Sequence, residues 1–304
     1  MTELRRVELK TGVTLNVAFA GDPSRPAIIL LHGFPESHRT WRELVPRLEG
    51  RFHLIMPDQR GFAGSDRPQE VREYETSMLV DDIFALADAL GIDRFALVGH
   101  DWGGAIAWNA ALKHPERLTR LAIINAPHPV VFQKSLIEDD NQRAASQYIT
   151  AFRMPGFEKA VETMDYEQFF EKTFSKHVEL GSIPQAEKRQ YIADWSQPGG
   201  LAAMLNWYRA AKVIVPPPGV AVPIPDWLLS AFPKVTVPTL VIWGMKDRAL
   251  LPMQLESLDT LVEELTVVRL PDVGHFAPWE APDDVARALE PFLAADAKAS
   301  AAAS

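Results

Sequence analysis

The chain has 304 residues, 47% of them apolar and 23% charged, and its formal net charge is −9. This length and composition are typical of a globular protein with a substantial core, in one large domain or two modest ones. The acidic balance argues against a nucleic-acid partner, because phosphate binding needs a basic face. The chain has no cysteine, which excludes disulfides, thiolate metal sites and a cysteine nucleophile.

The N-terminal residues, Met-Thr-Glu-Leu-Arg-Arg-Val-Glu, lack the apolar stretch of a signal peptide. No apolar run approaches the ~20 residues that a membrane span needs. We therefore expect a cytoplasmic protein without a membrane span.

The first part of the chain alternates between strand-like and helix-like patterns. Strands are predicted at residues 14–20, 27–31, 53–56, 95–98 and 121–124, and helices at residues 40–48 and 77–90. In the second of these helices, Leu79, Ile83, Leu86 and Leu90 fall on one face. Such alternation predicts a mostly parallel sheet with helices on both faces.

The character of the chain changes in residues 129–236. This segment is rich in polar and aromatic helical stretches and includes a proline-rich stretch at residues 215–225. The elements predicted after it are strands at residues 239–243 and 265–270 and a helix at residues 283–293. We interpret residues 129–236 as a helical cap domain, inserted into a discontinuous α/β core that comprises residues 1–128 and 237–304.

The strand at residues 95–98 leads into Gly-His-Asp-Trp-Gly, which has the form of a nucleophile elbow with Asp101 where serine is expected. A carboxylate is already ionised at neutral pH and needs no base to attack. It is a modest nucleophile, best suited to displacing a group from a saturated carbon. The product is an ester on Asp101, which another group must hydrolyse.

The general base for this hydrolysis is assigned to His275. In a hydrolase with such an elbow the acid follows the nucleophile and the histidine comes last, and only His275 among the eight histidines fits that order. Asp247, after the strand at residues 239–243, is the predicted orienting acid. The other place for this acid holds Asn125, which cannot supply the charge. His32 and His100 are interpreted as structural.

Hydrolysis of the ester places negative charge on a carboxyl oxygen of Asp101, which needs preorganised donors. The backbone N–H groups of Phe34, in His-Gly-Phe-Pro, and of Trp102 are the predicted pair. The bond between Phe34 and Pro35 is a candidate cis peptide.

Three motifs, HGFPES at residues 32–37, DQRGF at residues 58–62 and GHDWGG at residues 99–104, resemble the α/β-hydrolase fold superfamily. The similarity covers almost the entire chain and is greatest to the epoxide hydrolase branch. It implies a mostly parallel eight-stranded sheet flanked by helices, with an inserted helical cap. It also implies hydrolysis of epoxides to vicinal diols through an ester on Asp101, resolved by water that His275 activates.

Opening an epoxide releases an alkoxide, a poor leaving group that benefits from a proton donor. The resemblance implies that two cap tyrosines, Tyr148 and Tyr208, supply it. By helical spacing alone both could instead be core aromatic residues. The predicted substrate pocket is lined by Phe34, Trp102, Phe152 and Phe276. Ile149 and Arg153, beside the first tyrosine, depart from the commoner forms of the family.

Haloalkane dehalogenases also use an aspartate nucleophile and a histidine base. Trp102 matches one of their halide donors, but Phe34 stands where a second donor, often asparagine, would be. A haloacid dehalogenase would need arginines shortly after Asp101, where the chain reads Trp-Gly-Gly-Ala-Ile-Ala. Both remain alternatives to epoxide hydrolysis. A non-catalytic receptor on this fold predicts loss of Asp101, Asp247 or His275, and all three are present.

No cofactor or metal is expected, because the histidines lack ligand spacing and no glycine-rich dinucleotide motif occurs. The expected partner is a small-molecule epoxide. The size and stereochemistry of the substrate, the regiochemistry of opening and the oligomeric state, a homodimer included, stay open.

Overall fold

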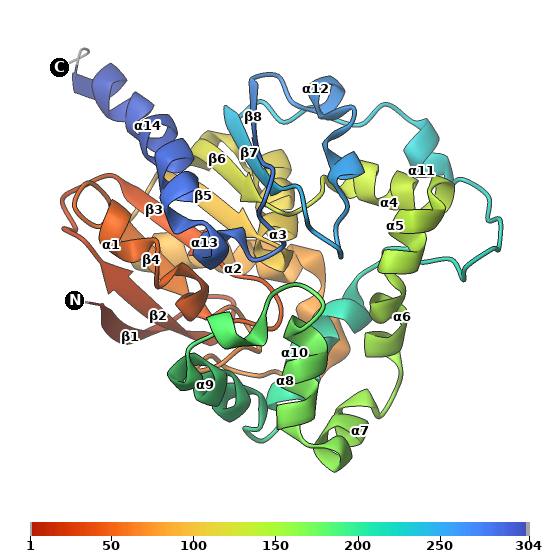
Figure 1. Ribbon diagram of the computed structural model, residues 1–304. Helices are drawn as coiled ribbons and strands as arrows, with labels where there is room; N and C mark the ends of the chain where they lie inside the picture. The colour runs from red at the N-terminus through yellow and green to blue at the C-terminus, as the bar shows by residue number, and fades with distance from the viewer. Residues whose placement is uncertain (1, 302–304) are drawn as a thin grey trace.

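The computed structural model describes residues 2–301, within which eight strands form one sheet. The spatial order is β1-β2-β4-β3-β5-β6-β7-β8, and the strands from β4 to β8 in this order run parallel. Two antiparallel pairs, β1 with β2 and β2 with β4, complete the sheet. The predicted eight-stranded, mostly parallel sheet is confirmed (Figure 1). The strands are β1 Glu3–Glu8, β2 Thr14–Ala20, β3 Ala27–Leu31, β4 His53–Pro57, β5 Phe95–His100, β6 Leu118–Ile124, β7 Thr239–Gly244 and β8 Leu265–Leu270.

Seven of these strands coincide with predicted segments, and the eighth, β1, was not located from the sequence. Five of the six residues of β1 are exposed. An edge strand of this kind buries no face, so it shows no alternation of apolar and polar residues. The pattern that located the other strands is therefore missing from β1.

Helices cover both faces of the sheet, because successive strand residues point to opposite sides. In β3, Ile29 and Leu31 pack with α2 (Thr76–Ala89) and α3 (Trp102–Lys113). Ile28 and Leu30 pack into the second apolar cluster, which includes residues of α1 (Val45–Leu48) and α14 (Pro282–Ala301). The sheet thus has an apolar layer on each side.

The helix predicted at residues 40–48 is wrong as a single element. The structure has a 3₁₀ turn, η1 (His38–Trp41), followed by the separate helix α1. Pro46 lies in the first turn of α1, where its missing N–H costs nothing, whereas inside a continuous helix it would remove a hydrogen bond. The last helix, α14, extends beyond its predicted end to Ala301.

A group of helices is inserted between β6 and β7 and gathers on one side of the sheet (Figure 1). The division of the chain into core and cap at residues 129 and 236 stays a prediction. The inserted helices are α4 Pro129–Glu138, α5 Asp140–Ala145, α6 Gln147–Arg153, α7 Phe157–Met164, α8 Tyr166–Phe174, η4 Leu180–Ser182, α9 Gln185–Trp195, α10 Gly200–Ala210 and α11 Asp226–Leu229. The remaining short elements are η2 Val71–Tyr74, η3 Pro115–Arg117, η5 Pro252–Leu255, α12 Leu258–Leu261 and α13 Ala277–Glu280.

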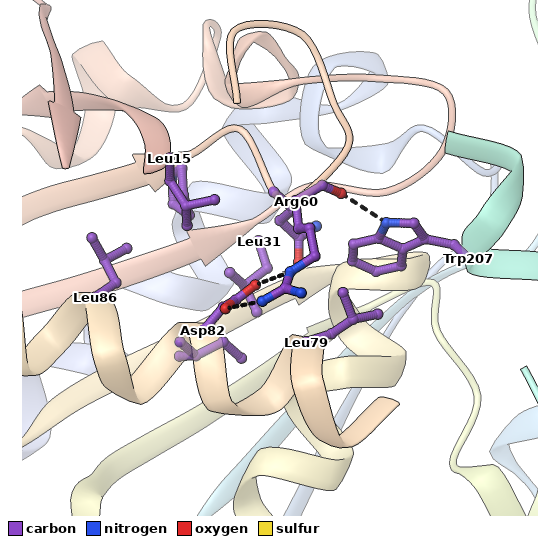
Figure 2. A pocket seen from close by; sticks show the side chains of 10 residues that line it. Leu15, Leu31, Arg60, Leu79, Asp82, Leu86 and Trp207 are labelled. Carbon is purple, nitrogen blue, oxygen red and sulfur yellow. Dashed lines mark hydrogen bonds and ion pairs between the residues drawn. The ribbon is translucent and has the colours of Figure 1, made fainter. Parts of the chain in front are cut away.

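Indole donors join the inserted helices to the loops of the sheet. The Trp195 Nε1 donates to the Pro35 carbonyl over 2.7 Å, and the Trp207 Nε1 donates to the Arg60 carbonyl over 2.9 Å. Figure 2 shows the second contact beside a cavity of about 10 Å³, where the buried Arg60 guanidinium makes two 2.7 Å bonds to Asp82. The loop that receives α10 is therefore held by a two-pronged ion pair.

Among residues 2–301, no helix is both long enough and apolar enough to cross a membrane.

Candidate active site

Asp101 occupies a tight turn between β5 and α3. Its backbone is at φ 51° and ψ −121°, a region that residues with a side chain rarely adopt. Small neighbours permit the turn: a Cβ on Gly103 would lie 2.1 Å from the Leu31 carbonyl oxygen, and one on Gly33 would lie 2.3 Å from Asp101 Oδ1. The turn holds the carboxylate at the carboxyl end of the sheet, where sites of open α/β folds lie.

The structure brings Asp101 together with His275 and Asp247. Because Asp247 follows β7 and His275 follows β8, both lie at the carboxyl end of the sheet, as Asp101 does. His275 Nδ1 lies 2.7 Å from Asp247 Oδ2, and His275 Nε2 lies 3.7 Å from Asp101 Oδ2. The imidazole therefore lies between two carboxylates.

Charge in this arrangement favours the imidazolium form of His275. Burial opposes the charge, but the Asp247 carboxylate, aided by that of Asp101, outweighs burial and raises the pKa of His275 to about 9. Burial alone would raise the pKa of the Asp247 carboxyl, but the charge and the hydrogen bond of His275 outweigh burial and lower this pKa. Both shifts describe one ion pair.

Asn125 has a function that the sequence did not reveal. Its Nδ2 donates to Asp247 Oδ2 over 2.8 Å, and its Oδ1 accepts from the Gly244 N–H over 3.0 Å. The backbone N–H groups of Ala249 and Leu250 donate to the other oxygen of Asp247. Asn125 thus helps to hold the acid. Its position after β6, the strand next to β7, was the signal available in the sequence.

His100 contacts the backbone of His275, and Glu36 lies on the other side of the His100 ring. The Nε2 of His100 lies 2.8 Å from the His275 carbonyl oxygen, and its Nδ1 lies 3.8 Å from Glu36 Oε2. The other oxygen of Glu36 accepts from Tyr191 and Trp279, over 2.7 and 3.0 Å. The backbone of His275 is therefore held as well as its ring.

One of the two predicted oxyanion donors contacts Asp101. The Phe34 N–H donates to Asp101 Oδ1 over 2.8 Å, and the bond between Phe34 and Pro35 is cis. Trp102 is the first residue of α3, where backbone N–H groups have no partner within the helix. Its use as the second donor stays a prediction.

A cavity of about 400 Å³ opens beside Asp101. Tyr148 and Tyr208 both line it, with ring centroids 6.1 Å apart and planes at 82°. Burial raises the pKa of both phenols, and the nearby Asp101 carboxylate raises it further. Both phenols therefore remain neutral hydrogen-bond donors at physiological pH.

Of the four predicted pocket residues, only Trp102 is among the described residues that line this cavity. The rings of Phe34 and Phe152 pack against Tyr208 instead, at centroid distances of 5.2 and 5.0 Å. Phe276 packs beside His275 and stacks on Trp279. These three residues pack against site residues and are not among the described residues that line this cavity. Their contribution to the substrate pocket stays a prediction.

The rest of the cavity wall was not predicted. It comes from α2, α3, α4, α6, α11, the segment after α10 and connecting loops, so the shape of the cavity depends on how the inserted helices pack. The remaining lining residues are Thr76, Ala105, Ile106, Asn109, Pro127, Pro129, Phe132, Gln133, Ile149, Ala211, Lys212, Val213, Trp227 and Leu250.

Comparison with known proteins identifies the family of this chain. Residues 26–282 match the family model of the α/β hydrolase fold. The AB hydrolase superfamily protein YfhM of Bacillus subtilis is 34% identical, over 93% of this chain and 95% of that protein. Epoxide hydrolase A of Mycobacterium tuberculosis is 29% identical, over 93% of this chain and 94% of that protein.

Two solved structures are similar throughout. One is described among novel epoxide hydrolases of the α/β hydrolase superfamily from metagenomes of hot environments; it is 45% identical, covers 97% of this chain and 99% of that one, and has a TM-score of 0.89. An inhibitor complex of Bacillus megaterium epoxide hydrolase is 27% identical, with 95% and 99% coverage and a TM-score of 0.82. The chain is therefore a hydrolase that belongs to the α/β-hydrolase fold family, in its epoxide hydrolase branch.

Proposed function

We propose that this protein hydrolyses epoxides to vicinal diols through a covalent ester on Asp101. The observation that carries the proposal is one cavity lined by the carboxylate of Asp101 and by two neutral phenols, Tyr148 and Tyr208. Several of the similar proteins are epoxide hydrolases, which supports the same chemistry.

In the first step Asp101 attacks the less hindered carbon of the epoxide. Its Oδ1 is occupied by the Phe34 N–H, so Oδ2 is the oxygen free to attack. The C–O bond of the ring breaks as the ester bond forms, and Tyr148 and Tyr208 hydrogen-bond the oxygen that leaves. A phenol proton passes to the alkoxide, which is the stronger base.

In the second step His275 takes a proton from water, and the hydroxide adds to the Asp101 carboxyl carbon. Charge develops on Oδ1, where the N–H of Phe34 already donates and that of Trp102 is proposed to donate. Formation of the ester removes the charge of Asp101, one of the groups that raises the pKa of His275. The imidazole therefore becomes easier to deprotonate once the ester exists. Asp247 keeps the imidazole oriented. The bond between the Asp101 carboxyl carbon and Oδ2 then breaks, and the diol leaves with Oδ2 and the proton that His275 took from water. The carboxylic acid regenerated at Asp101 returns its proton to the tyrosinate, so the carboxylate and the phenol are both restored.

A haloalkane dehalogenase is the second candidate, because the Trp102 side chain lines the cavity beside Asp101. Halide would need a second side-chain donor, and Phe34 offers none. A haloacid dehalogenase would need arginine, and no arginine is among the described residues that line the cavity. Two phenols in the wall favour an oxygen leaving group over a halide.

The test is a single turnover in ¹⁸O-labelled water. The first diol should carry unlabelled oxygen from Asp101, and label from solvent in that turnover would contradict the ester. The His275→Gln variant should accumulate the ester as a mass increase. Epoxides and haloalkanes offered side by side separate the two candidates, since halide release comparable to diol formation would favour the dehalogenase.

A cytoplasmic location, a small-molecule epoxide as the partner and the absence of a nucleic-acid partner belong to the same proposal. The net charge of −9 supports the last of these.

A further inference from the structure

Arg153 joins the two helices that carry the cavity tyrosines. It is the last residue of α6, and Tyr148 is the second residue of the same helix. The Arg153 Nε donates to the carbonyl oxygen of Tyr208 over 2.8 Å, and its Nη2 donates to that of Ala211 over 2.9 Å. One side chain from the helix of the first phenol thus holds the backbone of the second.

The chemistry of the helix end explains why arginine suits this position. The last carbonyl groups of an α-helix have no partner within the helix, and α10 ends at Ala210. The planar guanidinium presents two N–H groups at a fixed angle and so reaches two carbonyls at once. Burial lowers the pKa of Arg153, and no carboxylate among the described residues offsets this effect. Arg153 is therefore committed to carbonyl groups rather than to an ion pair.

The other end of the connection is fixed to the core. Trp207, the neighbour of Tyr208 in α10, donates to the Arg60 carbonyl in the loop that Asp82 braces (Figure 2). The core therefore positions α10, and Arg153 positions α6 relative to α10. Phe152 packs against both phenols, with ring centroids 5.6 Å from Tyr148 and 5.0 Å from Tyr208.

We propose that Arg153 is a positioning residue that holds Tyr148 and Tyr208 at the separation at which both phenols reach one epoxide oxygen. The inference rests on the proposed function, because only ring opening uses both phenols. Arg153 acts through the backbone of Tyr208 and does not touch the substrate. Ester hydrolysis by His275 does not depend on it.

The test measures ester formation in a His275→Gln background, where the ester accumulates and is read by mass. Adding Arg153→Met should slow ester formation on the order of tenfold, because misplacement of a reacting group by a fraction of an ångström is costly. Arg209→Met is the matched control: Arg209 follows Tyr208 in α10, but its side chain contacts Glu158 at 2.5 Å, Asn206 Oδ1 at 3.1 Å and the Met154 carbonyl at 3.5 Å. The rate of this variant should stay within about twofold, because none of these contacts holds the carbonyl of Tyr208. Equal slowing by both substitutions would overturn the proposal.

A double-mutant cycle separates positioning from general stabilisation of the helices. In a Tyr148→Phe background only one phenol remains, so Arg153→Met should add less than about twofold further slowing. The same factor in both backgrounds would contradict the inference.

Arg153→Lys keeps the charge but presents a point donor that reaches one carbonyl at a time. We expect a rate between those of arginine and methionine. A full rate with lysine would show that charge, and not the two-carbonyl contact, is what matters.

The two proposals fail differently. If His275→Gln enzyme with Arg153 intact forms no ester, the proposed function fails. If the ester forms at the same rate with and without Arg153, only the positioning inference fails.

Discussion

The two halves of the site are held in different ways. Asp101, Asp247 and His275 follow β5, β7 and β8 of one sheet, and direct contacts such as the 2.7 Å contact between His275 and Asp247 set their geometry. Tyr148 and Tyr208 come from two separate helices, α6 and α10, and their rings lie 6.1 Å apart. Their placement depends on Arg153 and Trp207, which donate to backbone carbonyls.

Because of this difference, we expect substitutions in the two halves to slow different steps of the proposed reaction. We call Asp101, Asp247 and His275 the sheet half of the site, and Tyr148 and Tyr208 the helical half. A change in the sheet half should impair the nucleophile or the base, whatever the leaving group. A change in the helical half should affect ring opening first and leave ester hydrolysis intact. Four predictions test whether the two halves act on separate steps.

Asp101→Asn should lower kcat by about 10⁴-fold, since a neutral amide of the same size cannot form the ester. Steady-state diol formation measures the loss. The tyrosine half stays intact in this variant, so retained activity would mean that the phenols and a water molecule suffice without a covalent step.

Asp82→Ala should lower the free energy of unfolding by about 3–5 kcal/mol, because it leaves the Arg60 guanidinium buried without its carboxylate. Urea unfolding measures the change. The matched control is Asp81→Ala: Asp81 is the preceding residue and pairs with Lys113 at the surface. It should cost no more than about 1 kcal/mol. A similar cost for both variants would show that the buried pair does not brace the loop under α10.

Tyr208→Phe should slow ester formation by about 10²-fold, as loss of a proton or hydrogen-bond donor does, while the rate of ester hydrolysis is unchanged. Single-turnover mass analysis resolves the two steps. Tyr166→Phe, in α8 and away from the described cavity wall, is the control and should be neutral. Equal slowing of both steps would argue against separate halves.

The stability of the protein should fall as the pH rises from about 6.5 to 9. Folding raises the pKa of His275 from 6.5 to about 9, so the folded state binds this proton more tightly than the unfolded state. The stabilisation is complete below about pH 6.5 and is lost as the pH passes through 9. The difference in free energy of unfolding between wild type and His275→Gln isolates this effect. A difference that does not change with pH would mean that no such ion pair forms.

The sheet and its catalytic candidates were accessible to sequence reasoning because the signals are local. Apolar segments bounded by turn residues located seven strands, and the small residues around Asp101 marked the elbow. The order of Asp101, Asp247 and His275 along the chain then placed them at one sheet edge, and the structure brings them together.

The directions in which the side chains around the cavity point depend on tertiary packing and were not predictable from the sequence. Phe34, Phe152 and Phe276 are aromatic residues near the site, yet they pack against its members instead of lining the cavity. Arg153 lies 55 residues before the carbonyl that it holds, and Trp207 lies 147 residues after the one that it binds.

Sequence patterns were sufficient to predict the fold, the nucleophile and its two partners. The spacing of apolar residues located the strands, and the order of motifs along the chain identified the three site residues. The cavity wall, the bracing by Asn125 and the coupling of the two phenols through Arg153 were decided by packing. No pattern of neighbouring residues encodes a contact between side chains and backbone that lie so far apart in the chain.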